Sequence, residues 1–555
     1  MEKLFKNLTA LIVALFVLLS SMSSLLPRRD TVDITVNASV TGETVTNIAS
    51  NANVWDMGTS FYEPQPEPDN NVFEFVRYVQ LMQCTGGTAQ RDLFVDPYDT
   101  STYTDYDFSR LISNCRGILE LGAKPHLKLG GVPLKFTSGY TLGGFGMNVY
   151  PPDDYDLYYG YIKAIACALV EEFGIDEVLT WRFGCMTEYE NGDWFMAKSG
   201  KPEDSATEYC KLYDYTVQAL VDVLGDTVFV GAHSMSVTEG LWDEALFIEH
   251  IARGTNYANG GTGTRMCFLS ASYYDMTPGK YTSGKTLPET IEYLRSTAEG
   301  FGLNNLIYGI DEGRILSGNT SGTDGSELFS RTVGFTWQAA YDARLFMQGI
   351  ENGLDYFSSW GCLSNGLING YPTVSYHVAK NLAGFSGSKI ADTAVSTGIM
   401  RKGVEANCLC VWNEETSVLR VMAYNFKNDV SYDKSVELNF TVELPQLDGK
   451  AVTVTKSLVC DDCNFFDEWQ HDRATHGIGD NCFAWSPDDP WIDSTVTLSD
   501  AAARELYFSQ LRDSYIEASR LTPTQSTMQV TDGKLEFTES LDASNVVFYE
   551  IKAAD

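Results

Sequence analysis

The chain has 555 residues, of which 44% are hydrophobic, and it shows no excess of glycine or proline. This composition is typical of folded globular proteins and excludes the disordered and fibrous classes. The chain carries 74 acidic and 39 basic residues, which gives a formal net charge of −35. Nucleic acids and anionic membranes are bound through clustered Lys and Arg, so this charge argues against both as partners and leaves neutral or cationic ligands.

The first 27 residues have the layout of a secretory signal peptide. Lys3 and Lys6 precede an apolar run over residues 8–19, and small residues follow at 20–24. We therefore expect the protein to be secreted or held at the cell surface. An uncleaved signal anchor stays open as the alternative, because residues 20–26 would extend the apolar run to about the 20 residues that span a bilayer.

Twelve cysteines in an exported chain would permit a disulfide framework. Six of them fall within apolar strand or helix patterns, which predicts buried free thiols: Cys84, Cys115, Cys167, Cys185, Cys210 and Cys267. The spacing Cys460-x-x-Cys463 lacks the second cysteine pair or histidine pair that a zinc site needs. We expect one local disulfide or none, and no metal.

Short apolar runs alternate with amphipathic helical stretches between residues 47 and 385, which is typical of βα units on a parallel sheet. The expected strands lie at residues 48–54, 79–84, 124–129, 178–186, 228–230, 266–271, 306–310 and 355–359. The expected helices lie at residues 155–173, 204–224, 241–253, 286–300 and 329–351. Eight strands is the number of a (β/α)8 TIM barrel, so the fold class is α/β.

After residue 385 the pattern changes to short alternating strands separated by turn residues. They lie at residues 408–412, 419–424, 436–442, 451–458 and 546–551. This pattern predicts a C-terminal antiparallel β-sandwich over residues 386–555. Residues 31–45 also alternate, and we expect the segment 28–46 to join this second domain before the chain enters the barrel.

Two glutamates stand where expected strands of the barrel end, which is where barrel enzymes build their active sites. Glu188 follows the fourth strand and Glu312 the seventh. Two carboxylates on one rim suit glycoside hydrolysis, in which one acts as acid and base and the other attacks the sugar. The alternative is that both are solvated loop carboxylates. Asp311 is a rival nucleophile, but adjacent strand residues point to opposite faces, which favours Glu312 alone.

Several segments resemble a known family of enzymes. The stretch EFGIDEVLTWRFGCMTE at residues 172–188 carries most of the likeness. Further matching segments are residues 106–109, 122–125, 209–216, 228–231, 270–274, 358–360 and 462–469. Taken together they resemble glycoside hydrolase family 39, which contains retaining β-xylosidases and α-L-iduronidases built on a barrel and a β-sandwich.

The resemblance implies roles for individual residues. Glu188 would be the acid/base and Glu312 the nucleophile, with Tyr274 near the nucleophile and Trp360 as a platform for the sugar. No metal or organic cofactor is implied. The partner would be an oligosaccharide or polysaccharide substrate.

The chain departs from the family pattern around the sugar. Thr187 stands where the family usually has an asparagine that contacts the sugar, and Ser272 replaces a histidine typical of strand six. Lys128 takes the place of a glutamate on strand three, and residues 83–86 differ from the family's strand-two motif. The departures leave the reaction type better supported than the substrate.

Three further polar residues on barrel strands are candidate substrate contacts. His126 and Lys128 share parity on strand three and would both point into the barrel. Lys128 would pair either with a carboxylate of the framework or with a substrate carboxylate, as in a uronic acid. His233 ends strand five and would contact a sugar or form a local hydrogen bond.

Residues flanking these strand ends have open interpretations. Trp55 and Asp56 follow the first strand and would line the sugar pocket. Glu190 is expected to be solvated, and Arg314 would either orient the nucleophile or pair with Asp311.

The sequence therefore predicts a secreted, two-domain retaining glycosidase that is nearest to β-xylosidases. An arabinoside or a uronide is the alternative substrate. The alternative from another class is a catalytically inactive carbohydrate-binding protein at the cell surface. The oligomeric state is not indicated.

Overall fold

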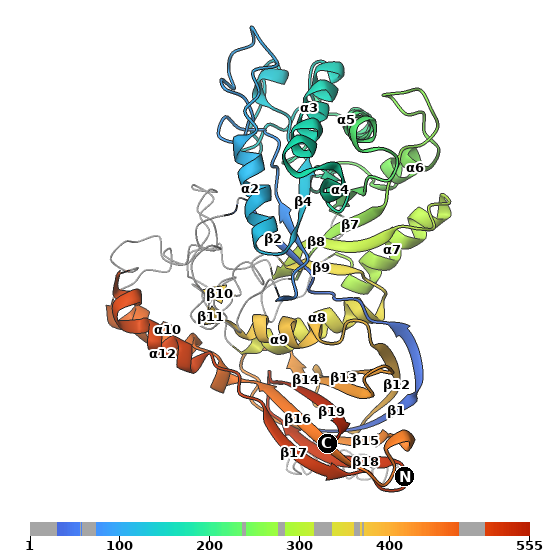
Figure 1. Ribbon diagram of the computed structural model, residues 1–555, viewed down its shortest axis with the longest axis vertical. Coiled ribbons are helices and arrows are strands. Elements are labelled where there is room, and N and C mark those ends of the chain that lie inside the picture. Colours follow the sequence, from blue (N-terminus) through green and yellow to red (C-terminus); the bar gives the residue numbers. More distant parts are fainter. Residues whose placement is uncertain are drawn as a thin grey trace, which may run out of the picture. The chain divides into compact units, whose positions relative to one another are not determined.

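The computed structural model describes residues 30–55, 57, 74–235, 240–275, 284–315, 336–359, 367–368, 371–476 and 505–554 (Figure 1). The chain forms two compact units. One contains residues 44–388 and 457–523, and the other contains the N-terminal residues to 43 with residues 389–456 and 524–555. The predicted signal segment lies outside the described residues. No helix within the described ranges has both the length and the apolar character to cross a membrane.

A closed barrel of eight parallel strands forms the centre of the larger unit, within its described residues. The strands are β2 (Asn51–Val54), β3 (Tyr78–Leu81), β4 (Lys124–Leu129), β5 (Arg182–Cys185), β6 (Val230–Ser234), β7 (Phe268–Asp275), β8 (Ile307–Ile315) and β9 (Tyr356–Ser359). Each pairs with the next in chain order, and β2 closes the ring on β9 through Asn51 and Ser358. The predicted TIM barrel is confirmed, with β5 shorter than expected because residues 175–178 form a helical turn.

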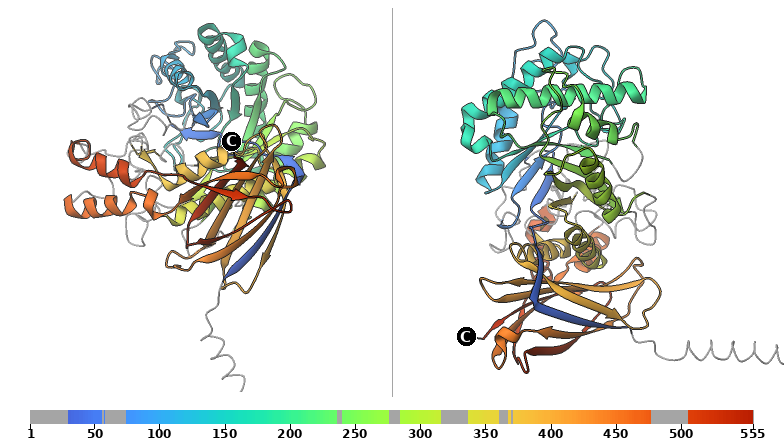
Figure 2. Two further views of the ribbon diagram at one scale, coloured as in Figure 1. Left: turned by 60° about the horizontal axis from the view of Figure 1, so that its bottom comes forward. Right: turned by 90° about the vertical axis from the view of Figure 1, so that its right-hand side faces the viewer.

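Helices alternate with the strands and surround them in the larger unit (Figures 1 and 2). They are α2 (Ser109–Glu120), α3 (Tyr155–Phe173), α4 (Ile175–Val178), α5 (Pro202–Leu224), α6 (Ala245–Arg253), α7 (Leu287–Gly300), α8 (Trp337–Glu351) and α9 (Val374–Ala383), with a 3-10 turn at Leu134–Phe136 and a hairpin of β10 (Leu367–Ile368) and β11 (Tyr371–Pro372). Local chemistry sets their starts: Asp154 accepts from the first backbone amides of α3, and Thr286 and Glu289 form a capping box on α7.

The pairing of β7 with β8 contains an irregularity that positions the site. Ala271 pairs with Ile310, but the next pair is Ser272 with Glu312. Asp311 is therefore an extra residue in β8, and strict alternation of side chains fails there because a bulge sets two residues against one. The alternation assumed in the sequence analysis therefore fails here, and Asp311 is fully buried among the barrel side chains. That Glu312 rather than Asp311 reaches the pocket stays a prediction.

The smaller unit is built on a sheet of nine strands, counted over the described residues, in the order β17-β16-β19-β14-β13-β12-β1-β15-β18. Their bounds are β1 (Thr31–Thr44), β12 (Lys389–Thr397), β13 (Val404–Asn413), β14 (Val418–Lys427), β15 (Val436–Glu443), β16 (Ala451–Val459), β17 (Thr524–Gln529), β18 (Lys534–Leu541) and β19 (Val546–Ala553), with a 3-10 turn at Pro445–Leu447. Figure 2 shows β1, in blue, lying among the strands of the C-terminal part. Its pairing with β15 is parallel, unlike the antiparallel pairs expected throughout.

The nine-stranded sheet folds back on itself, because strands far apart in its order meet through their side chains. Glu539 on β18 accepts a hydrogen bond of 2.5 Å from Tyr549 on β19 and lies 2.7 Å from the Lys456 ammonium on β16. Phe537 on β18 also packs against Tyr549 on β19, with a centroid distance of 5.2 Å. The enclosed face is the core of this unit.

The described residues within 457–523, which the sequence analysis placed with the sandwich, belong to the barrel unit. Their described parts form a 3-10 turn (Asp461–Cys463), α10 (Phe466–His476), a π-helical turn (Tyr507–Leu511) and α12 (Arg512–Ala518). Asn464 donates to the Thr336 hydroxyl at 3.1 Å, and His377 Nε2 donates to the Ser519 carbonyl at 2.9 Å. These bonds tie the segment to the starts of α8 and α9.

The ten described cysteines are free thiols, including Cys460 and Cys463. Of the six cysteines predicted to be mostly buried, Cys115, Cys185 and Cys210 are buried, Cys84 and Cys267 are half-buried, and Cys167 is exposed. Cys362 and Cys482 lie outside the described residues.

Candidate active site

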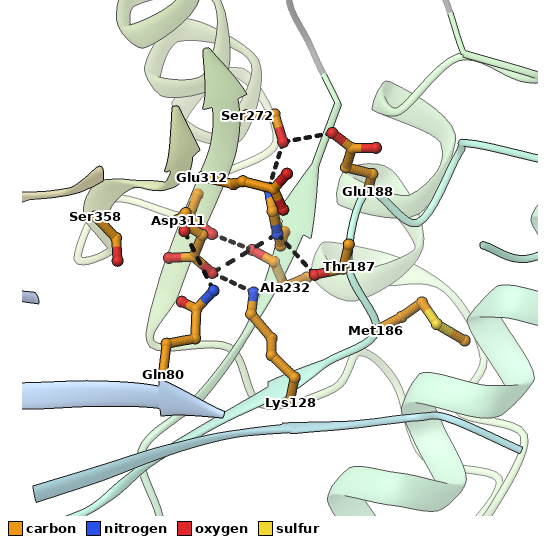
Figure 3. A network of polar contacts seen from close by, with 12 residues as sticks. Gln80, Lys128, Met186, Thr187, Glu188, Ala232, Ser272, Asp311, Glu312 and Ser358 are labelled. Atoms are coloured by element: carbon orange, nitrogen blue, oxygen red, sulfur yellow. Dashed lines mark hydrogen bonds and ion pairs between the residues drawn. The ribbon is translucent and has the colours of Figure 1, made fainter. Parts of the chain in front are cut away.

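Glu188 lies in the loop that follows β5, the fourth strand of the barrel. Its backbone is in the left-handed region, with φ of 42°, which turns the side chain back over the barrel. Only 8% of the residue is exposed. Its Oε1 accepts a hydrogen bond of 2.6 Å from the Ser272 hydroxyl, and Oε2 accepts one of 2.8 Å from the Asn191 amide. Both carboxylate oxygens are therefore held in place. Figure 3 shows the bond from Ser272.

Glu312 lies on β8, the seventh strand, and is half-buried. Its Oε1 accepts a hydrogen bond of 2.6 Å from the Tyr274 hydroxyl on β7. Tyr274 therefore lies beside Glu312, as the sequence analysis expected.

Ser272 brings the two glutamates to one end of the barrel. It is the register partner of Glu312 on the neighbouring strand, and adjacent strands lie about 4.8 Å apart. The same serine donates to Glu188. Glu188 thus lies one hydrogen bond from the residue directly beside Glu312. Two carboxylates so placed can act together on one bound molecule.

Thr187, His233 and Ser272 form a hydrogen-bonded series that ends on Glu188. The Thr187 hydroxyl lies 3.2 Å from Nδ1 of His233, and Nε2 of His233 lies 2.9 Å from the Ser272 hydroxyl. All three residues are buried, with 3% exposure or less. Burial, reinforced by the positive charge of Lys128, holds the pKa of His233 well below its ordinary value, so the imidazole is neutral.

A buried ion pair lies in the barrel interior among these residues. The Lys128 ammonium contacts Asp311 Oδ2, and both side chains are fully buried (Figure 3). Tyr356 donates to the other Asp311 oxygen at 2.6 Å. Burial opposes the charge of Asp311, but the positive charge of Lys128 outweighs it and keeps the pKa of Asp311 below its ordinary value. Of the two predicted partners for Lys128, the framework carboxylate is the one observed.

A family model described as glycosyl hydrolases family 39 matches residues 74–405, which is more than half of the chain. The chain belongs to glycosyl hydrolases family 39. This confirms the resemblance drawn from the sequence motifs.

Individual relatives agree with this membership. A β-xylosidase of Geobacillus stearothermophilus is 29% identical over 119 residues, which are 21% of this chain and 22% of the relative. A β-xylosidase of Caldicellulosiruptor saccharolyticus is 28% identical over 152 residues, which are 27% of this chain and 28% of the relative. The matched parts thus span about a quarter of these relatives.

Solved structures of the family share the fold over nearly the whole chain. A monomeric β-xylosidase of Caulobacter crescentus has a TM-score of 0.64 at 16% identity, covering 95% of this chain and all of that one. A bacterial orthologue of human α-L-iduronidase has a TM-score of 0.65 at 13% identity, covering 95% of this chain and 84% of that one. At these identities the likeness shows the fold.

The other predicted contact residues of this family 39 chain lie in different surroundings. His126 is fully buried and packs edge-on against Phe268, and its ring nitrogens bond to none of the described residues. Burial lowers the pKa of His126 to about 3, so it too is neutral. Trp55 lies beside the Glu188 loop, with its ring 6.1 Å from that of Trp194. Asp56 and Trp360 lie outside the described residues.

Two expectations about charged neighbours were wrong. Glu190 is fully buried, because the Ser234 hydroxyl and the Met235 amide each donate to its Oε1 at 2.6 Å. Arg314 neither orients the nucleophile nor pairs with Asp311. Its φ of 112° turns the side chain toward α8, where its Nε donates to Asp342 at 2.7 Å.

The sequence analysis missed Asn191 as a contact of Glu188. The signal was present, because Asn191 is followed by Gly192 and such pairs mark tight turns. The backbone amide of Asn191 donates to the Glu188 carbonyl at 2.7 Å and closes the turn. The turn brings the Asn191 side chain back onto the Glu188 carboxylate. No group of three or more metal-ligating side chains is assembled among the residues that the structure describes.

Proposed function

We propose that this chain is a retaining glycoside hydrolase, with Glu188 as acid/base and Glu312 as nucleophile. The observation that carries the proposal is the placement of both carboxylates around Ser272, which pairs with Glu312 in register and donates to Glu188. Their positions, after the fourth strand and on the seventh, support the same roles. So does membership of the family, whose relatives named above include β-xylosidases.

The reaction proceeds in two displacements. A carboxylate oxygen of Glu312 attacks the anomeric carbon while Glu188 gives its proton to the departing glycosidic oxygen, which leaves a glycosyl ester on Glu312. Glu188, now ionised, takes a proton from water, and the resulting hydroxide displaces Glu312 from the sugar. Two inversions return the original configuration. The two carboxylates supply the nucleophile and every proton transfer, so the proposal includes no metal or organic cofactor.

The proposed substrate is a β-xyloside within an oligosaccharide or polysaccharide. The names of the curated relatives favour it over an arabinoside. A uronide is disfavoured by a specific observation: Lys128 is fully buried against Asp311 and does not reach a substrate carboxylate. Thr187 is also fully buried, so its hydroxyl serves His233 and is not presented to a sugar.

Export through residues 1–27 is part of the proposal, with the protein secreted or held at the cell surface. The intact mass of protein recovered from culture medium tests it. A mass that lacks about the first 27 residues would agree with a cleaved signal peptide, whereas a full-length chain in the membrane fraction would indicate the anchor.

The function is tested by incubating the purified protein with aryl β-xyloside, α-arabinofuranoside, β-glucoside and α-iduronide. We expect turnover of the β-xyloside, with the first product detected by proton NMR in the β configuration. An α product would contradict the double displacement. Binding of xylo-oligosaccharides without turnover of any substrate would instead favour the inactive carbohydrate-binding protein.

A further inference from the structure

The series of hydrogen bonds that ends on Glu188 has a fixed direction. Ser272 has a single hydroxyl proton, which it donates to Oε1 of Glu188 at 2.6 Å. Its remaining contact, with Nε2 of His233, must then be one in which the imidazole donates. A neutral imidazole with its proton on Nε2 accepts at Nδ1, where the Thr187 hydroxyl lies 3.2 Å away. The direction of each hydrogen bond in the series therefore determines the direction of the next one.

We propose that His233 is a positioning residue for Glu188, acting through Ser272, and that it fixes the Ser272 hydroxyl proton on Oε1 of Glu188. This inference rests on the proposed function of Glu188. A serine hydroxyl rotates freely on its own, but the proton on Nε2 of His233 occupies one side of the Ser272 oxygen. The serine proton is thereby directed onto Oε1 of Glu188, which acts as a permanent acceptor.

The charges facing His233 support a neutral imidazole that does not act as an acid itself. Lys128 and His126 come from β4, and Asp311 comes from β8 with its Oδ2 at 4.0 Å from Nδ1. Asp311 is already neutralised by Lys128. Protonation of His233 would add a second buried cation beside Lys128, and it would remove the acceptor that Thr187 uses. The imidazole therefore keeps one proton and one orientation.

The first test compares substrates whose leaving groups differ in their need for an acid. The variants are Ser272→Ala, His233→Leu and His233→Gln, measured as kcat/KM on a phenyl and on a 2,4-dinitrophenyl glycoside of the sugar that the protein turns over. For Ser272→Ala and His233→Leu we expect the phenyl to dinitrophenyl ratio to fall about tenfold to a hundredfold, because a misplaced acid affects only the poor leaving group. His233→Gln keeps an amide donor toward Ser272, so its phenyl to dinitrophenyl ratio of kcat/KM should stay close to that of the wild type.

A matched control lies on the same strand as Ser272. Ser270 is fully buried two residues earlier, and its hydroxyl donates to the Ala232 carbonyl at 3.2 Å. Ser270→Ala removes the same group from the same face, so it reproduces the loss of packing and stability without reaching Glu188. We expect its leaving-group ratio to stay within about twofold of the wild type. An active wild type with an equal ratio in Ser272→Ala and Ser270→Ala would overturn the inference.

A second measurement does not depend on activity. Nitrogen-15 NMR of histidine-labelled full-length protein, with His233 assigned from the missing signal in His233→Gln, reports which ring nitrogen carries the proton. We expect Nε2 to be protonated and the ring to stay neutral between about pH 5 and pH 8. Protonation at Nδ1, or titration within that range, would overturn the inference. If the wild type turns over no glycoside, the proposed function fails separately and these spectra still decide the hydrogen-bond direction.

Discussion

Glu312→Ala is expected to lower kcat by roughly 10⁴-fold to 10⁶-fold on every leaving group, because no other group can form the glycosyl ester. Asp311 does not substitute for it, since that carboxylate is fully buried against Lys128 and Tyr356. Initial rates on an aryl β-xyloside check the prediction. Activity that survives in Glu312→Ala but disappears in Asp311→Asn would assign the nucleophile to Asp311.

Glu188→Ala should have a different signature, which separates the two roles. Removal of the acid is expected to lower kcat/KM by about 10²-fold to 10⁴-fold on a phenyl glycoside and far less on a dinitrophenyl glycoside, which leaves without a proton. The second step lacks its base, so the glycosyl enzyme should accumulate. It should be detected as an initial burst of released dinitrophenol. Azide, which needs no base to attack, should restore turnover and yield a β-glycosyl azide.

Glu190→Gln is the matched control for Glu188→Ala. Glu190 is a second buried glutamate of the same loop, but it bonds to Ser234 and Met235. The substitution should reduce stability while leaving the dependence on the leaving group unchanged. An equal loss on both leaving groups in Glu188→Ala, without rescue by azide, would contradict the acid/base assignment.

The barrel was predictable from the sequence because it depends on local patterns, and the resemblance to family 39 then singled out the two glutamates. Buried strands of a parallel sheet form short apolar runs, and the chain repeats them eight times with helices between. A polar residue at the end of such a run must face the rim of the barrel. Glu188 and Glu312 satisfy this condition, and the family motifs around them distinguished them from other polar residues at strand ends.

The surroundings of the two glutamates were not predictable, because each depends on partners far apart in the chain. Asp311 turned inward through a bulge against β7, and a register shift leaves no mark in the alternation of one strand. Glu190 is buried because a neighbouring strand offers it two donors. The sequence identified Thr187 and Ser272 as departures from the family, but only the fold shows that His233 joins them.

Lys128→Met is expected to be the most destabilising of the substitutions considered, by about 3–5 kcal/mol, because it leaves Asp311 buried without its cation. The matched control is Lys124→Met on the same strand. Lys124 pairs with Glu177 at 2.6 Å, but both side chains are about a third exposed, and such pairs contribute about 0–1 kcal/mol. Urea unfolding followed by tryptophan fluorescence measures both. Equal losses in the two variants would show that the buried pair is not a charged one.

The penalty in Lys128→Met should shrink as the pH is lowered. In the wild type the pKa of Asp311 is depressed, so its contribution to stability is present above the unfolded value of about 4 and is lost only as the pH falls below it. Without Lys128, burial raises that pKa instead, so the variant gains stability relative to the wild type between about pH 8 and pH 5. Lys128→Met/Asp311→Asn removes the charge altogether and keeps an acceptor for Tyr356. The double variant should recover most of the lost stability at neutral pH, and its stability relative to the wild type should not rise between about pH 8 and pH 5. A double variant as unstable as Lys128→Met would show that the loss comes from packing and not from the unpaired charge.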